Sequence, residues 1–135
     1  MRGKLITLEG GEGAGKSTVL AAIRDRLHQQ GIANQVTREP GGTPLGEGIR
    51  ELVLGAHLGG RVCAESELLL MFAARAQLVR ETIEPALAAG TWIVSDRYVD
   101  ASYAYQGAGR GQPMDRIAAL EEWACAGVRA DFPLL

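Results

Sequence analysis

The sequence has no excess of positive charge, few cysteines and no long apolar run. Its 14 Lys and Arg residues stand against 16 Asp and Glu, for a formal net charge of -2, so the overall charge does not favour a nucleic-acid polymer as partner. Cys63 and Cys125 form no CxxC pair and lack metal-ligand spacing, which argues against a zinc site or a disulfide framework. No apolar run reaches the ~20 residues of a membrane span, so no membrane partner is expected.

Signals for secretion and for several domains are also missing. Only a few apolar residues precede Glu9, and no small-residue cleavage site follows them. With two unpaired thiols, this predicts a cytoplasmic protein in a reducing compartment. No repeat, low-complexity tract or linker divides the chain, and its length suits one compact core, so we predict a single domain over residues 1–135.

Short apolar stretches alternate with longer helical patterns. Such an alternation predicts an α/β fold, with a parallel sheet flanked by helices. The apolar run 91–96 is bounded by Gly90 and a charged pair, and it predicts a buried parallel strand. Strands are predicted at 5–9, 34–37 and 91–96, with another beginning at 131. Helices are predicted at 17–30, 44–54, 98–106 and 113–126, and over 65–89 as two helices that meet near 80–82.

Local signals define several boundaries. Gly31 suits the C′ position of the first helix, and Thr43 followed by Pro44 suits an N-cap and first helical position. Glu39-Pro40 is a candidate cis peptide, because X-Pro bonds tolerate that form. The predicted inner face of the first helix consists of Val19, Leu20, Ile23 and Leu27.

The clearest motif is a phosphate-binding loop at the end of the first strand. Gly10-x4-Gly15-Lys16-Ser17 matches GxxxxGK[ST], and it lies between a strand and a helix as that motif requires. Backbone N–H groups and the helix dipole would surround phosphates, Lys16 would reach the β- and γ-phosphates, and Ser17 would help to hold Mg2+. The residues expected to bind ATP phosphates are Gly10, Gly11, Glu12, Gly13, Ala14, Gly15, Lys16, Ser17 and Thr18.

Motifs further along the chain narrow the class of P-loop protein. "TREPGGTPLGEGIREL", "LLLMFAARAQ" and "SDRYVDASYAYQGAGRG" follow "EGGEGAGKST" in this order. In order and separation they resemble the bacterial thymidylate kinases, and the resemblance covers essentially the whole chain. It implies a P-loop nucleoside-monophosphate kinase fold and transfer of a phosphoryl group from ATP to dTMP, with Mg2+ as cofactor, no nucleic-acid polymer as partner and a homodimer as assembly.

The same resemblance implies roles for individual residues. The implied catalytic residues are Lys16, Arg38, Asp96 and Arg97, with Ser17 and Asp96 at the metal. The implied dTMP-binding residues are Glu12, Arg38, Arg50, Met71, Phe72, Arg75, Arg97, Ser102, Tyr105 and Gln106.

Several of these roles can be described in physical terms. The planar fork of Arg97 suits a bidentate grip on the acceptor phosphate, and the guanidinium of Arg75 offers only donors, which suits the O4 acceptor of thymine or uracil. Glu12 would accept a hydrogen bond from the deoxyribose 3′-hydroxyl. The ring of Tyr105 would reject a ribose 2′-hydroxyl by its bulk, while Ser102 and Gln106 would complete the hydrogen bonds to the pyrimidine edge.

One position departs from the family pattern. Where the family usually has a base-stacking phenylalanine, four residues before Arg75, this chain has Met71, and Phe72 follows one residue later. Both offsets fall on roughly the same helical face, so either side chain could cover the base.

Other interpretations of these residues remain open. Asp96 and Arg97 could form a surface ion pair, Glu12 a solvated loop charge and Arg50 an exposed helix arginine, and Tyr103 and Tyr105 could simply pack in the core. A deoxynucleoside kinase is a rival function, although two arginines would then lack an acceptor phosphate. A non-catalytic P-loop module or a GTPase-like switch is another, but the guanine-reading NKxD element is absent.

The end of the chain gives a further expectation. Members of the family continue past the point that matches "VRADFPLL", through a basic lid and further strands and helices. The lid arginines that would neutralise the transferring phosphate have no counterpart here, and such a loss can reduce the rate by ~10^3 or more. The sequence therefore predicts a fragment that has a dTMP pocket and a P-loop but little or no kinase activity. Region 65–89 could provide a dimer face or serve the core.

Overall fold

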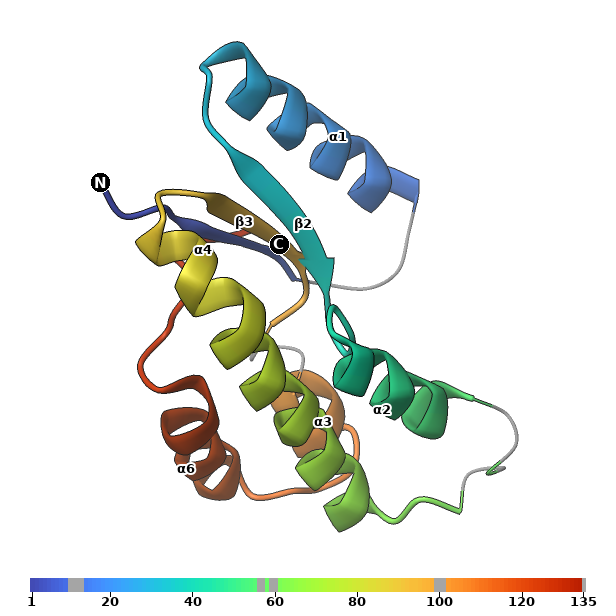
Figure 1. Ribbon diagram of the computed structural model, residues 1–135. Helices are drawn as coiled ribbons and strands as arrows, with labels where there is room; N and C mark the ends of the chain where they lie inside the picture. Colours follow the sequence, from blue (N-terminus) through green and yellow to red (C-terminus); the bar gives the residue numbers. More distant parts are fainter. Residues whose placement is uncertain (10–13, 56–57, 59–60, 99–101, 135) are drawn as a thin grey trace.

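A computed structural model describes residues 1–9, 14–55, 58, 61–98 and 102–134. Its centre is a parallel sheet with the strand order β2-β3-β1-β4 (Figure 1). The strands are β1 (Leu5–Leu8), β2 (Asn34–Arg38), β3 (Trp92–Asp96) and β4 (Phe132–Leu134). Leu5 and Ile93 in the two central strands are fully buried, as expected for parallel strands covered on both faces.

Helices cover both faces of this sheet. Ile6 and Val94 pack against Leu27 of the first helix, while Leu5 and Ile93 face the remaining core, because successive strand residues point to opposite faces. Figure 1 shows the first helix apart from the others, beside β2. The helices are α1 (Ala14–Gln29), α2 (Pro44–Leu54), α3 (Ala64–Leu78), α4 (Glu84–Ala88) and α6 (Met114–Cys125), with two π-helical segments, η2 (Val79–Ile83) and η3 (Tyr103–Ala108).

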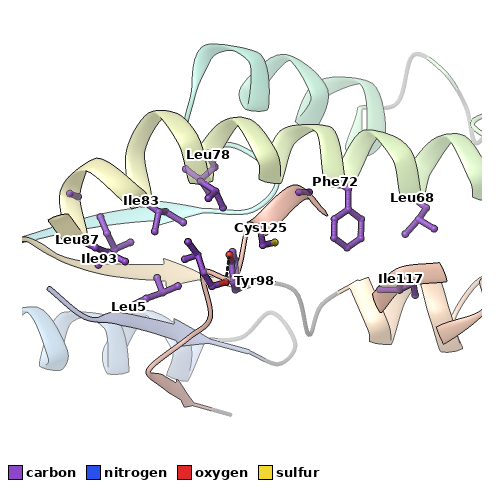
Figure 2. Close-up of a cluster of buried hydrophobic side chains, with 14 residues drawn as sticks. Leu5, Leu68, Phe72, Leu78, Ile83, Leu87, Ile93, Tyr98, Ile117 and Cys125 are labelled. Carbon is purple, nitrogen blue, oxygen red and sulfur yellow. Dashed lines mark hydrogen bonds between the residues drawn. The ribbon is translucent and has the colours of Figure 1, made fainter. Parts of the chain in front are cut away.

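The larger core lies between the sheet and the helical run α3-η2-α4. Figure 2 shows Leu87 and Ile93 at one end of this core, and Phe72 and Leu68 of α3 on the side of Ile117 in α6 at the other. Between these ends the phenol of Tyr98 donates a hydrogen bond of 2.9 Å to the Val128 carbonyl. The core thus ties the end of β3 to both α3 and α6.

The structure confirms the predicted α/β fold and most of the predicted elements. The Thr43 side chain caps α2 by accepting from Gly46 N–H at 2.9 Å, and Pro44 opens that helix. Gly31 has a positive φ of 70°, and the Glu39-Pro40 peptide is cis. The strand ends differ from the prediction by one residue, as is usual for local patterns.

The two helices predicted over 65–89 are present as α3 and α4, and they meet at 79–83, where the junction near 80–82 was predicted. The junction is the π segment η2, in which Glu84 N–H bonds to Val79 carbonyl, so the run 64–88 stays helical throughout. Two other predictions about helices were wrong in detail. Val19 was expected on the inner face of α1 but is 45% exposed, since α1 contacts the sheet from Leu20 onward. Tyr98, where a helix was expected to begin, is not helical, whereas Ser102 and the π segment η3 are.

Candidate active site

The site lies at the carboxyl edge of the sheet, where β1 and β3 end. Lys16 is in the first turn of α1, and Asp96 is the last residue of β3 and the register partner of Leu8 in β1. Lys16 Nζ lies 2.5 Å from Asp96 Oδ1. The first turn of α1 and the end of β3 therefore meet, at the edge where open α/β sheets bind ligands.

Arg38 brings the end of β2 to the same edge. It is the register partner of Asp96, and its Nη2 lies 2.6 Å from Glu47 Oε1 on α2. The hydrogen bond to Glu47 and, to a smaller extent, the charge of Asp96 raise the pKa of Arg38. The side chains of Arg38 and Glu47 are both about half exposed. The salt bridge therefore holds the Arg38 guanidinium in a position that is open to solvent.

Arg97 has a backbone conformation that is rare for a residue with a side chain. Its φ is 74°, although it is not glycine. Its N–H bonds to Leu8 carbonyl at 3.0 Å, and its carbonyl accepts from Ser95 Oγ at 2.6 Å. These two bonds hold the unfavourable backbone next to Asp96, and strain of this kind is typically found at functional sites.

The part of the phosphate-binding loop that the structure describes begins at residue 14. Ser17 and Thr18 lie with Lys16 in the first turns of α1, and both are exposed. The N-terminus of this 16-residue helix thus faces the carboxyl edge of the sheet with its positive dipole end. The predicted phosphate contacts of Gly10, Gly11, Glu12 and Gly13, and of the Ala14 side chain, lie outside the described residues.

The end of β2 and the turn after it position two charged residues differently. Arg38 is exposed, whereas the Glu39 side chain is only 2% exposed. Gly42, at φ 82°, donates its N–H to Glu47 Oε2 at 2.8 Å, and a side chain there would collide with Thr37. Within the "REPGG" stretch, the Arg38 side chain therefore lies in solvent and the Glu39 side chain lies in the core.

Arg50 lines an open hollow next to this turn. Its Nη1 donates to the Pro40 carbonyl at 3.0 Å, so its position is fixed by the backbone that carries Glu39. The hollow measures about 490 Å³ and is lined by Arg38, Glu47, Gly48, Arg50, Glu51, Leu54 and Gly55.

Arg75 is the largest fully buried side chain in the described part of the molecule. Its Nε and Nη2 both lie 2.6 Å from Glu39 Oε1, and its Nη2 also donates to Tyr98 carbonyl at 3.1 Å. Its Nη1 donates to Ser102 Oγ at 2.9 Å. Burial raises the pKa of the Glu39 carboxyl, and the adjacent guanidinium opposes that shift. The Arg75 guanidinium is therefore held in place by contacts to Glu39, Tyr98 and Ser102.

Of the two residues considered for covering a base, Phe72 is part of the core. Its ring lies 4.7 Å below the Arg75 guanidinium carbon, and Figure 2 shows it on the side of Ile117. Met71 is also buried, at 8% exposure, but it belongs to neither hydrophobic cluster.

Ser102 and Gln106 follow the end of β3. Ser102 is fully buried against Arg75, and Gln106 is 3% exposed and donates from Nε2 to Glu67 Oε1 at 2.8 Å. The Tyr105 side chain lies outside the described residues, as does that of Tyr103. Arg75 and Ser102 are thus buried together at the C-terminal end of α3, and Gln106 is buried beside Glu67 at the N-terminal end of that helix.

Residues 8–128 of the chain match the family described as Thymidylate kinase. The chain belongs to this family. It is 56% identical over 134 residues to the thymidylate kinase of Chromobacterium violaceum, covering 99% of this chain and 62% of that protein. It is 54% identical over 136 residues to the thymidylate kinase of Cupriavidus metallidurans, covering 100% of this chain and 65% of that protein. The chain therefore spans less than two thirds of the length of these relatives.

A solved structure gives the same assignment. The crystal structure of thymidylate kinase from Ehrlichia chaffeensis matches with a TM-score of 0.83 and 33% identity, covering 98% of this chain and 74% of that one. The predicted nucleotide kinase fold of the thymidylate kinase family is thereby confirmed. Among the described residues, no helix is both long and apolar enough to cross a membrane.

Four charged residues of this site were missed by sequence reasoning. Glu39 and Glu47 hold Arg75 and Arg38, while Glu67 accepts from both Gln106 and Arg110. A signal existed for Glu39, an acidic residue at a strand end just before a proline. None existed for Glu67 and Arg110, which lie 43 positions apart.

Proposed function

We propose that this chain holds the donor and acceptor sites of the thymidylate kinase reaction, transfer of the γ-phosphoryl group of ATP to dTMP to give ADP and dTDP. Little or no turnover by this chain remains the prediction, because it spans less than two thirds of its relatives. The observation that carries the proposal is the meeting of Lys16, Arg38 and Asp96 at the ends of three parallel strands. A cluster of this kind suits phosphoryl transfer, because that reaction needs little covalent chemistry from the protein and depends on positioning and charge neutralisation.

ATP would bind on the side of α1. Its phosphates would be held by the backbone of the loop before Ala14 and by the N-terminus of the helix, with Lys16 as a point charge on the β- and γ-phosphates. The contact between Lys16 and Asp96 keeps that ammonium at the edge of the sheet before ATP arrives.

The Asp96 carboxylate and the Ser17 hydroxyl fit a Mg2+ ion. Both are hard oxygen donors, and Mg2+ prefers one or two carboxylates together with phosphate oxygens and water. A cage of three or more acidic, His or Cys side chains is not needed, and none occurs among the described residues. When bound with ATP, Mg2+ would neutralise charge on the β- and γ-phosphates.

The acceptor phosphate of dTMP would bind between Arg38 and Arg97. Arg38 is the last residue of β2 and Arg97 follows β3, and each can grip phosphate oxygens with two N–H groups. The strained backbone of Arg97 would then be a positioning feature. Arg50 would line the neighbouring wall of the dTMP pocket, next to the Pro40 carbonyl that fixes it.

The thymine base would lie beside Arg75, with Ser102 and Gln106 at its polar edge. Because the Phe72 ring already has the Arg75 guanidinium on one face, we propose Met71 as the residue that covers the base. Contacts of Glu12 with the 3′-hydroxyl and of Tyr105 with the 2′ position remain predictions, as do the single-domain organisation and the cytoplasmic location.

Equilibrium binding provides the direct test. We expect dTMP to bind to the chain at least about tenfold more tightly than thymidine, because only dTMP has a phosphate for Arg38 and Arg97. ATP should bind in a Mg2+-dependent manner, and a coupled ADP-release assay would report transfer. Equal affinity for thymidine and dTMP would overturn the proposal and favour a deoxynucleoside kinase.

We also propose that the protein forms a homodimer through the outer face of α3 and α6. Trp123 and Leu69 project there, at 79% and 60% exposure, next to a hollow of about 290 Å³ between the two helices. A two-fold interface needs one patch that carries both projecting and hollow parts, and this face has both. In light scattering, Trp123→Glu should give monomers, while the equally charged Val19→Glu on α1 should not. Monomeric wild-type protein would refute this proposal.

A further inference from the structure

The side-chain amide of Gln106 is buried but only half satisfied. The residue is 3% exposed, and its Nε2 donates to Glu67 Oε1 at 2.8 Å. Its Oε1 is buried as well and has no hydrogen-bond partner among the described residues. A buried carbonyl without a donor is unfavourable, so an acceptor of this kind in a ligand site indicates a donor on the ligand.

Glu67 determines which end of that amide is left over. A carboxylate only accepts hydrogen bonds, so Gln106 must turn its NH2 group toward Glu67 and its oxygen away. Arg110 fixes Glu67 in turn, since its Nη1 lies 2.7 Å from Glu67 Oε2 and 3.2 Å from the Val62 carbonyl. In this network Glu67 accepts hydrogen bonds from both Arg110 and Gln106, and the Gln106 oxygen is left over as an acceptor.

The unpaired Gln106 Oε1 lies close in sequence to Ser102, which is hydrogen-bonded to Arg75. Ser102 and Gln106 are four positions apart, and Ser102 accepts one of the two N–H groups of Arg75 Nη1. We assign the second N–H of that nitrogen to the ligand. The site would then present a donor from Arg75 and an acceptor from Gln106.

We propose that Glu67 and Arg110 are positioning residues that set the base specificity of this site, by holding Gln106 with its oxygen as the acceptor. Thymine and uracil present the O4 acceptor beside the N3–H donor, which complements this pair. Cytosine presents an amino donor and a bare N3 acceptor, so both contacts would be reversed. This inference rests on the proposed function, because it requires dTMP in this pocket.

Glu67→Gln provides the sharpest test, since it keeps the size of the side chain and lets the Gln106 amide turn over. We expect the ratio of dCMP to dTMP dissociation constants to fall about tenfold, with ATP affinity unchanged. Glu65→Gln is the matched control, because it removes the same charge from the same helical turn without touching Gln106. A purely structural role for Glu67 would weaken both nucleotides equally and leave the ratio unchanged.

A second pair of variants keeps the proposal testable if Glu67→Gln does not fold. Arg110→Met should lower the same ratio, and Arg110→Lys, which can still donate to Glu67, should restore most of it. An unchanged ratio in Glu67→Gln and Arg110→Met, with dTMP still preferred over thymidine, would overturn this inference and leave the proposed function standing. Wild-type protein that does not prefer dTMP to thymidine would overturn the proposed function and this inference with it.

Discussion

Lys16 Nζ lies 2.5 Å from Asp96 Oδ1, and this contact joins the P-loop helix to the end of β3. The side chains of Lys16 and Asp96 are 14% and 36% exposed, so the pair lies at the surface of the sheet edge rather than in the core. An ion pair that ligand phosphates and a metal can rearrange is suited to binding, whereas its contribution to stability is small.

Lys16→Ala should therefore weaken ATP binding without unfolding the protein. Loss of the charge-assisted contacts to phosphate should lower ATP affinity at least about tenfold. The Asp96 carboxylate, no longer paired with Lys16, would also repel the ATP phosphates. Titration calorimetry measures the affinity, and circular dichroism checks the fold. Lys4→Ala is the control, because Lys4 is the other lysine of the chain and is exposed. Equal ATP affinity in the two variants would remove Lys16 from the site.

Variants of the buried pair Glu39–Arg75 can distinguish a role in stability from a role in binding dTMP. Arg75→Met leaves the Glu39 carboxylate buried without its partner, which should cost about 3–5 kcal/mol of unfolding free energy. The double variant Glu39→Leu with Arg75→Met should recover much of this loss, because neither charge is then buried alone. Urea unfolding measures both changes.

In these two variants, dTMP affinity should not change in parallel with the free energy of unfolding. Since Arg75 is proposed to read the base, the single and the double variant should both lose dTMP affinity while ATP affinity stays near that of the wild type. A double variant that regains both stability and dTMP affinity would show that Arg75 acts only in packing.

Glu47 should make stability depend on pH in the acid range. Its hydrogen bond from Arg38 lowers the pKa of the Glu47 carboxyl from 4.5 to about 2. Because the folded pKa is below the unfolded one, the stabilisation is complete above about pH 4.5 and is lost as pH falls toward 2. Its size should stay below ~1 kcal/mol, since both side chains are about half exposed and screened by solvent.

Unfolding midpoints of wild-type protein and Glu47→Gln at several pH values test this. The difference between the two should be greatest near neutral pH and should shrink below pH 4.5. A difference that stays constant down to pH 2 would contradict a paired Glu47 in the folded state.

The two cysteines should differ in reactivity. Hydrogen bonding to the Ser66 hydroxyl and N–H lowers the pKa of the exposed Cys63 thiol, whereas burial raises the pKa of the Cys125 thiol. Because the thiolate is the reactive form, Cys63 should be alkylated first at neutral pH. Mass spectrometry after brief iodoacetamide treatment measures this order, and Ser66→Ala should slow the reaction of Cys63. Faster labelling of Cys125 would contradict the structure.

Much of the fold was predictable because its signals are local. The strand 92–96 is a short apolar run that ends in Asp96, and the cap at Thr43 and the cis bond at Pro40 depend on neighbouring residues. The junction near 80–82 was predicted, but its π-helical form was not, because apolar periodicity does not distinguish a break from a wider turn. Val19 was misplaced because a helical face does not reveal how much of it a sheet will cover.

By itself, the sequence determined the motifs, their order and the chemical types at the site. The P-loop match, the "REPGG" turn and the Asp96-Arg97 pair can each be read from adjacent residues, since strand, turn and helix N-terminus are local structures. Only the tertiary structure decided which charges meet. Arg75 pairs with Glu39 and Gln106 with Glu67 at separations of 36 and 39 residues. Such contacts depend on how the sheet and α3 pack together, and a one-dimensional pattern contains no distance between segments.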